Sequence, residues 1–465
     1  MSDVVEAIAT KHVPLREAAE INPKVDRSLL SDDTLVSFVP MAAVGAADGQ
    51  IDVSTTRPYA EVKKGYTAFR DGDVLFAKVT PCMENGKMAV ARNLSNGQGF
   101  GSTEFHVLRP REGVDSSYLY HFVSSASFRK EAARHMTGVV GLRRVPSAFL
   151  QDELIPLPEL DEQRRIVAEI EKQFSRLDEA VANLQRVKAN LKRYKAAILK
   201  AAVEGRLVET EASLAHREGR SYETGEQLLQ RILEARRIQW AGRGKYKQPI
   251  DAEQPEDLVV PAGWAVASLD MLSIDSGYGT SQKCAYENAG PPVLRIPNVQ
   301  NGVLDLQDVK FAPADFRLRE IEAVRQGDML IIRTNGSKSL IGRAAVVLAE
   351  QATPMSFASY LIRFRLTCVG QVPDWVSLVW QTSKMREWIE AQAATSAGQH
   401  NVSMTVLARA AIPVPPVSEQ ERIVAEVDRQ LTILSGVEAE VDANLQRAQA
   451  LRQSTLARAF LTEGS

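Results

Sequence analysis

The sequence predicts an α+β protein in which two β-rich mixed domains are each followed by a long α-helix, and the two helices pack against one another. Three observations predict this fold class. One segment occurs twice in the 465-residue chain, apolar residues spaced by seven follow both copies, and short β-like runs broken by turn signals precede both copies. The chain is therefore expected to use one design twice.

The repeated segment begins with Ile-Pro-x-Pro. IPLPELDEQRRIVAEIEKQ starts at Ile155, and IPVPPVSEQERIVAEVDRQ starts 257 residues later at Ile412. The same offset relates Pro40 to Pro297, far upstream of this segment. Because matches at one offset are spread this widely, we expect the duplication to cover roughly the whole chain.

Residues 1–160 and 261–417 are the expected β-rich domains. A Gly-Asp pair stands at the start of one β-like run in each domain, at Gly72-Asp73 and at Gly327-Asp328. Trp264, in the turn that opens the second domain, is predicted to anchor its core. The strand signals are the runs DVLFAKV (73–79), EFHVL (104–108), MLIIR (329–333) and SYLIRFRL (359–366).

Residues 161–207 and 418–465 are predicted to be long helices that begin after prolines and stop near Gly205 and Gly464. At a rise of 1.5 Å per residue the first is about 65 Å long, so it is expected to act as a strut or spacer. Residues 208–260 form a charged connector with one helix expected at 225–242. The packing seam, which weakens toward the C-terminus, consists of Ile170, Phe174, Leu177, Val181, Leu184, Leu191, Ile198, Val427, Leu431, Leu434, Val441 and Leu445.

The composition favours a globular cytoplasmic protein. Hydrophobic residues make up 45% of the chain, and 56 Lys+Arg against 58 Asp+Glu give a formal charge of -2. No global positive field therefore exists, and any contact with nucleic acid has to use local patches. Three dispersed cysteines indicate neither a disulfide framework nor a zinc ribbon. We expect no signal peptide, no membrane-spanning helix and no membrane partner.

Motifs for catalysis are missing from the sequence. We find no glycine-rich cofactor loop with a methyltransferase motif, no phosphate-binding loop with its lysine, and no paired metal-ligand spacing among the six histidines. The chain is expected to be non-catalytic, with no catalytic residue and no metal ligand of its own. Recognition of another molecule is the remaining class of function.

Local basic and polar clusters are the candidate binding residues. Their alternative interpretation is a solvated helix face and ordinary surface loops, which the sequence leaves open. Cations attract phosphates, whereas amide and imidazole groups hydrogen-bond to base edges or complete a turn. In the first copy the candidates are Lys78, Lys87, Arg129, Lys130, Arg134, Arg143 and Arg144; in the second they are Arg333, Asn335, Ser337, Lys338, Arg343, Gln399, His400 and Asn401.

This combination resembles the specificity (S) subunit of type I restriction-modification enzymes, over essentially the entire chain. The resemblance is carried by the segments at 155–173 and 412–430 and by the Gly-Asp pairs. The stretch from Tyr278 to Cys284 also resembles the family pattern and adds Ser281 and Lys283 to the candidates. Gln399-x-Asn401 has the family's usual form, whereas the first copy departs from it with Leu142-Arg143-Arg144.

The resemblance implies two target-recognition domains that each read half of a split, asymmetric sequence in double-stranded DNA. It also implies that the helices form an antiparallel coiled coil and that the repeat has pseudo-two-fold symmetry. Two methyltransferase (modification) subunits and motor-nuclease (restriction) subunits are the implied partners, and these partners use S-adenosylmethionine, ATP and Mg. Two rival interpretations remain open: a coiled-coil adaptor, and a stand-alone DNA-binding regulator.

Overall fold

The computed structural model describes residues 11–28, 30–139, 141–240, 245–256, 258–300, 302–319, 322–396 and 398–460. The chain forms two compact units. The first combines the described residues up to Arg186 with those from Val441 onward, and the second is Val187–Glu440. Among the described helices, none is both long and apolar enough to span a bilayer.

The first unit is an α+β body. Its strands are β1 (His12–Pro14), β2 (Ala19–Ile21), β3 (Leu35–Val39), β4 (Thr56–Pro58), β5 (Thr67–Arg70), β6 (Val74–Ala77), β7 (Met88–Val90), β8 (Gln98–Gly101), β9 (Phe105–Pro110) and β10 (Leu154–Pro156). Its short helices are α1 (Leu15–Ala18), α2 (Tyr59–Val62), α3 (Ser116–Ser124), α4 (Ala126–Arg134) and α5 (Ser147–Asp152). The strands form sheets of order β2–β9–β6–β7 and β4–β3–β8–β5 and a β1–β10 ribbon.

The second unit repeats this plan. Its strands are β11 (Ala265–Ser268), β12 (Ser273–Tyr278), β13 (Pro292–Leu294), β14 (Lys310–Phe311), β15 (Asp328–Ile332), β16 (Thr334–Asn335), β17 (Ala344–Val346), β18 (Ser356–Phe357), β19 (Leu361–Leu366), β20 (Ala394–Ser396), β21 (Gln399–Asn401) and β22 (Ala411–Val414). Its domain helices are α9 (Val372–Trp380), α10 (Ser383–Gln392) and α11 (Met404–Ala408). The sheet β12–β19–β15–β17 has the order of β2–β9–β6–β7, and β11–β22 matches β1–β10.

The repeat reaches the level of single hydrogen bonds. In the first unit the Tyr118 hydroxyl donates to the Pro156 carbonyl at 2.7 Å. In the second unit Trp375, 257 residues later, donates its indole N–H to the carbonyl of Pro413 at 2.6 Å. The prolines of Ile-Pro-x-Pro thus fasten the strand before each long helix to an aromatic side chain of α3 or α9. The duplication predicted from the sequence is confirmed.

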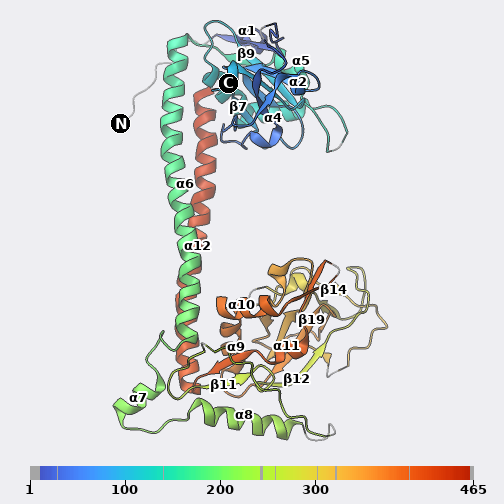
Figure 1. The fold of residues 1–465 in the computed structure, drawn as a ribbon, viewed down its shortest axis with the longest axis vertical. Helices are drawn as coiled ribbons and strands as arrows, with labels where there is room; N and C mark the ends of the chain where they lie inside the picture. Colours follow the sequence, from blue (N-terminus) through green and yellow to red (C-terminus); the bar gives the residue numbers. More distant parts are fainter. Residues whose placement is uncertain are drawn as a thin grey trace. The chain divides into compact units, whose positions relative to one another are not determined.

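The two long helices, α6 (Leu160–Val203) and α12 (Val417–Phe460), run antiparallel (Figure 1). Within the first unit, Gln173 accepts a hydrogen bond from Thr455 and Asp178 pairs with Arg452, so the partners run in opposite directions along the two helices. In the second unit Lys195 pairs with Glu438. Buried seam residues are Ile170, Phe174, Leu191, Ile198, Val427, Leu434 and Val441, whereas Leu177, Val181, Leu184, Leu431 and Leu445 are partly exposed.

The C-terminal end of the seam differs from the expectation. Instead of weakening, α12 packs there through Leu456 and Phe460, which lie outside the heptad phase read from the sequence. The Phe460 ring lies 5.3 Å from Tyr118 and 5.5 Å from Phe122, because this end of the helix contacts the first β-rich body rather than α6 alone. The expected stop at Gly464 lies outside the described residues.

The connector also differs, because it holds two helices rather than one. α7 (Glu211–Glu218) ends at Gly219 in the left-handed conformation, and α8 (Gly225–Gln239) begins with a capping box at Thr224. The indole N–H of Trp264 donates to Glu419 at 3.0 Å and its ring meets Trp375 edge-on. The predicted anchoring role of Trp264 is confirmed.

Acidification is expected to destabilise the first unit through His121. This α3 side chain packs edge-on against Phe174, and burial lowers the pKa of its imidazole to about 4. The unfolded chain binds the proton of this imidazole more readily than the folded chain does. The contribution of His121 to the free energy of unfolding is therefore fully present above the unfolded pKa of 6.5, and it falls as pH drops toward 4, by about 3 kcal/mol at most.

The repeat itself supplies the variant that tests this pH dependence. Leu378 occupies the position equivalent to His121, 257 residues later. In His121→Leu, urea unfolding followed by circular dichroism is expected to lose the part of the pH dependence between pH 6.5 and 4 that His121 contributes, while the part from His106, whose pKa burial also lowers, remains. An unchanged dependence would contradict the assignment to His121.

Candidate nucleic-acid interface

A polar β-ribbon in the second unit gathers several of the residues predicted from the sequence. β20 and β21 pair antiparallel around Gly398, which adopts a positive φ of 75°, and β21 also pairs with β16. This register places Asn335 opposite His400 and Thr334 opposite Asn401. Gln399 and Asn401 are exposed at the ribbon, while the His400 ring is hydrogen-bonded to the Thr395 hydroxyl at 3.0 Å. The ribbon therefore presents amide groups to solvent.

Arg333 lies at the base of this ribbon. Its carbonyl accepts a hydrogen bond from Val402, and its own N–H donates to the carbonyl of Tyr360. The guanidinium lies over the ring of Tyr278, 4.9 Å from the centroid. Tyr278 and Tyr360 are 48% and 52% exposed, which is unusual for large aromatic side chains and is typical of surfaces that stack against a partner. A cation and two aromatic rings thus adjoin the polar ribbon.

The other candidates of the second unit lie around this centre. Ser337 and Lys338 are exposed in the turn after β16, where Asn335 accepts a hydrogen bond from the Ser337 N–H at 2.8 Å. Arg343 donates to the Ser339 carbonyl, so it closes the same turn. Ser281 and Lys283 are exposed in the segment after β12; among the described contacts none joins their side chains to the ribbon.

The first unit has the same hairpin with different side chains. The backbone of Arg144 forms β-bridges with both Val79 and Thr137. In the second unit, Asn401 pairs in the same way with Thr334 and Ala394. Arg143 and Arg144 thus stand where the second unit has His400 and Asn401, 257 residues later.

Two glutamates hold these arginines. Arg144 forms a two-pronged pair with Glu104 at 2.7 and 2.9 Å, and its hydrogen bonds hold the pKa of Glu104 below the usual value. Arg143 lies 3.5 Å from Glu84. The sequence reasoning missed both glutamates, and the offset of 257 residues gives no signal for them. Only the structure shows that Tyr360 takes the place of Glu104, because its carbonyl accepts from the Arg333 N–H as that of Glu104 accepts from the Lys78 N–H.

The remaining cations of the first unit are dispersed. Lys87 donates to the carbonyls of Met41 and Val44 at 3.1 and 2.8 Å, and Arg129 donates to that of Glu84 at 2.6 Å, so both fasten loops. Arg134 pairs with Glu131 along α4, and Lys130 is exposed on the same helix. Of the predicted residues, the hairpin brings together Lys78, Arg143 and Arg144, because Lys78 directly precedes the strand residue that Arg144 bridges.

Comparison with known proteins places this architecture in a family. The family model for the type I restriction modification DNA specificity domain matches residues 10–193. The specificity subunits of the type I restriction enzymes EcoEI and EcoAI of Escherichia coli are 27% and 29% identical, over 94% and 89% of this chain and 79% and 76% of theirs. The chain therefore carries this DNA specificity domain over residues 10–193, and over most of its length it is similar to type I restriction enzyme specificity subunits.

Solved structures share the fold of this chain. A chain from a study of complex assembly and conformational transition of the type I R-M system matches with a TM-score of 0.69 and 19% identity, covering 99% of this chain and 100% of that chain. The HsdS subunit from Thermoanaerobacter tengcongensis matches with a TM-score of 0.51 and 20% identity, covering 97% and 96%. At these identities the likeness shows the fold.

The relatives that the chain resembles are specificity subunits, the non-catalytic components of type I restriction-modification systems. Within the described residues, no group of three or more His, Cys, Asp or Glu side chains is placed to hold a metal ion. The geometry described above is one of surface recognition: a ribbon with exposed polar groups in each unit, carried on a repeated framework.

Proposed function

We propose that this chain is a specificity subunit that binds a bipartite, asymmetric sequence in double-stranded DNA, with the hairpin face of each unit reading one half. One observation carries the proposal. The frameworks of the two units match down to single hydrogen bonds, yet the hairpins differ in chemistry, with Arg143 and Arg144 in one and His400 and Asn401 in the other. A repeated framework with divergent faces suits the reading of two different half-sites.

The side chains fit this division of labour. Amide groups such as those of Gln399 and Asn401 donate and accept at adenine edges, and arginine pairs with guanine or with phosphate. The exposed rings of Tyr278 and Tyr360 offer apolar contact beside Arg333. Phosphate contacts set the position of a protein on the duplex, whereas base-edge contacts carry the sequence information.

The proposal extends to the partners implied by the family resemblance. The subunit directs adenine methyltransferase subunits and motor-nuclease subunits to the site, and these partners supply the chemistry that uses S-adenosylmethionine, ATP and Mg. In support, the sequence holds no glycine-rich cofactor loop and no phosphate-binding loop with its lysine. Its near-neutral charge is consistent with DNA affinity that is shared with partner subunits.

Long-read sequencing of modified bases tests the proposed function. DNA is compared from cells that express the chain with its neighbouring methyltransferase and from cells that lack only this chain. A split motif, methylated on both strands and lost with the chain, is the expected result. Unchanged methylation with an active methyltransferase would favour the adaptor or the stand-alone regulator.

Glu104 is expected to limit unspecific DNA binding by the first unit. In Glu104→Gln the arginine it pairs with, Arg144, is freed for one further phosphate, so the slope of log K against log salt steepens by about 0.9 on a random duplex. Fluorescence anisotropy at several salt concentrations measures the slope. Asp152→Asn, which frees Arg16 in an exposed pair elsewhere on this unit, is the control. A slope that Glu104→Gln leaves unchanged would refute this role.

A further inference from the structure

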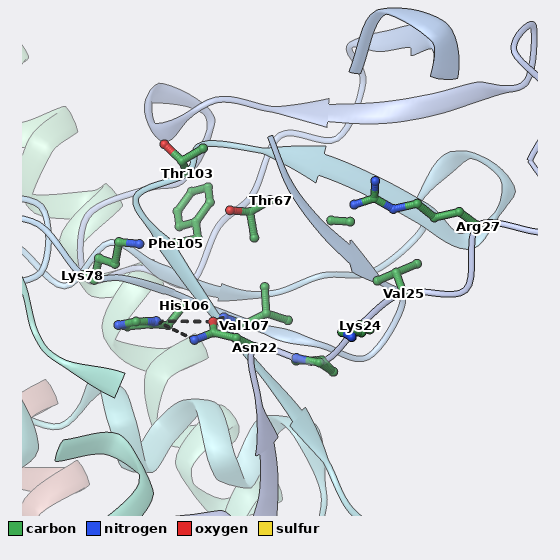
Figure 2. A pocket seen from close by; sticks show the side chains of 12 residues that line it. Asn22, Lys24, Val25, Arg27, Thr67, Lys78, Thr103, Phe105, His106 and Val107 are labelled. Carbon is green, nitrogen blue, oxygen red and sulfur yellow. Dashed lines mark hydrogen bonds between the residues drawn. The ribbon is translucent and has the colours of Figure 1, made fainter. Parts of the chain in front are cut away.

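The first unit contains a cationic pocket that shares Lys78 with the hairpin face and extends beyond it. Figure 2 shows this pocket, about 510 Å³ in volume, with walls from the segment after β2, the start of β5, the end of β6 and β9. Its volume falls within the range of sites that hold a small organic ligand. Lysine or arginine contributes three of the lining residues, Lys24, Arg27 and Lys78, and none of the twelve is acidic.

One wall of the pocket is fixed by hydrogen bonds among its own polar groups. Asn22 accepts from the Val107 N–H at 3.0 Å, and its amide nitrogen lies 3.0 Å from Nδ1 of His106. Nε2 of His106 lies 2.8 Å from the Val145 carbonyl, and burial lowers the pKa of the ring. The neutral ring therefore donates from Nε2 and accepts at Nδ1, so Asn22 and His106 build the wall and leave ligand binding to other groups.

The cations face the hollow. In Figure 2 the amino group of Lys78 and the guanidinium of Arg27 point into it from opposite sides, with Thr67 between them and Thr103 above. Arg27 uses one nitrogen to hold the Lys63 carbonyl at 3.0 Å. Within the described residues no carboxylate forms an ion pair with Lys24, Arg27 or Lys78, although the charge of Lys78 helps to lower the pKa of Glu104. Lysine and arginine side chains that line one hollow can contact phosphate oxygens.

The pocket adjoins the hairpin. The Lys78 carbonyl accepts a hydrogen bond from Val145, directly after Arg144, and Thr80 donates its N–H to the Arg143 carbonyl. In the second unit the equivalent cation, Arg333, already lies over the Tyr278 ring. The first unit thus presents the ammonium group of Lys78 at the position where the second unit has a guanidinium stacked on a tyrosine ring.

We propose that this pocket holds one phosphate-bearing nucleotide of the bound DNA strand, with its phosphate at the cationic lining that Lys24, Arg27 and Lys78 provide. The inference rests on the proposed function, because it takes DNA as the source of the nucleotide. It gives the first unit an anchor point that follows the backbone of one strand, beside the hairpin that faces the bases.

Saturation-transfer NMR on the full-length chain tests the pocket, with dAMP, deoxyadenosine and inorganic phosphate as probes. We expect transfer to dAMP, none to deoxyadenosine, and displacement of dAMP by inorganic phosphate and by duplex DNA. In Lys78→Gln and in Arg27→Gln, dAMP is expected to bind at least about tenfold more weakly, the loss typical of one hydrogen bond to a charged group. Lys11→Gln, at an exposed lysine before β1, is the matched control.

A further variant tests whether binding needs the open space of the pocket as well as its cations. Val25→Trp fills the hollow from its rim without removing a cation, and it is expected to abolish the dAMP signal while circular dichroism stays unchanged. Equal transfer to dAMP in wild type and in all three pocket variants would overturn the proposal. A bound dAMP that duplex DNA does not displace would overturn the assignment to a DNA strand and identify a free nucleotide as the ligand.

The failure of this inference is distinguishable from failure of the proposed function. If methylation of a split motif depends on the chain while the pocket variants bind random duplex with the salt slope of wild type, the pocket proposal is wrong and the function stands. If methylation does not depend on the chain but dAMP binding needs Lys78 and Arg27, the pocket stands without the proposed role.

Discussion

Asp328→Asn is expected to destabilise the second unit by about 3 to 5 kcal/mol, the loss found when one partner of a buried ion pair is removed. Asp328 is fully buried and accepts hydrogen bonds from Arg365 at 2.7 and 3.0 Å and from the Arg325 N–H at 2.9 Å. A second guanidinium, that of Arg363, lies 4.0 Å away. An amide keeps the shape of the carboxylate but leaves these buried cations without its charge.

Urea unfolding followed by tryptophan fluorescence measures this effect, because all five tryptophans lie between Trp240 and Trp388, in the second unit. The repeat offers a comparison in Asp73→Asn, where the buried carboxylate pairs with the guanidinium of Arg109 at 2.8 Å and accepts from the Arg70 N–H at 2.9 Å. That variant is expected to leave the tryptophan transition in place and to shift the first unit's transition in circular dichroism. Asp32→Asn, in an exposed pair with Lys63, is expected to cost at most about 1 kcal/mol. A tryptophan transition unmoved by Asp328→Asn would contradict a supporting role for the Gly-Asp pair.

Inserting four residues after Leu184 is expected to lengthen the spacer of the recognised DNA sequence or to abolish methylation, while both half-site sequences stay the same. The insertion adds about one helical turn, or about 6 Å, to α6, which continues from the first unit into the second. That length is close to the rise of two base pairs at about 3.4 Å each. The readout is the methylated motif found by long-read sequencing.

Two controls sharpen the experiment. A matched second insertion after Leu445 of α12, in the antiparallel partner, is expected to restore seam packing and to favour the longer spacer over loss of activity. The same four residues after Gly219, in the turn between α7 and α8, are expected to leave the motif unchanged. A changed half-site sequence in any of these variants would contradict the proposal that the helices act as spacers.

Much of the framework could be predicted from the sequence, because the framework depends on patterns among residues that are close together in the chain. The offset of 257 residues, the Ile-Pro-x-Pro segments and the heptad seam require only that neighbouring residues form the same elements in each copy, and α6 and α12 begin and end 257 residues apart. The packing of Leu456 and Phe460 could not be predicted in this way, because their partners, Phe174 and Tyr118, belong to two different elements. The phase of a single helix does not reveal such a contact.

The sequence by itself determined that the chain is a duplicated α+β protein with two long helices and divergent polar loops. Only the tertiary structure decided which cations are paired. Arg144 and Glu104 are 40 residues apart and Arg143 and Glu84 are 59 apart, so each pair forms only once strand register brings the two side chains to the same edge. The pocket around Lys78 arises in the same way, because its walls come from four segments that no local pattern connects.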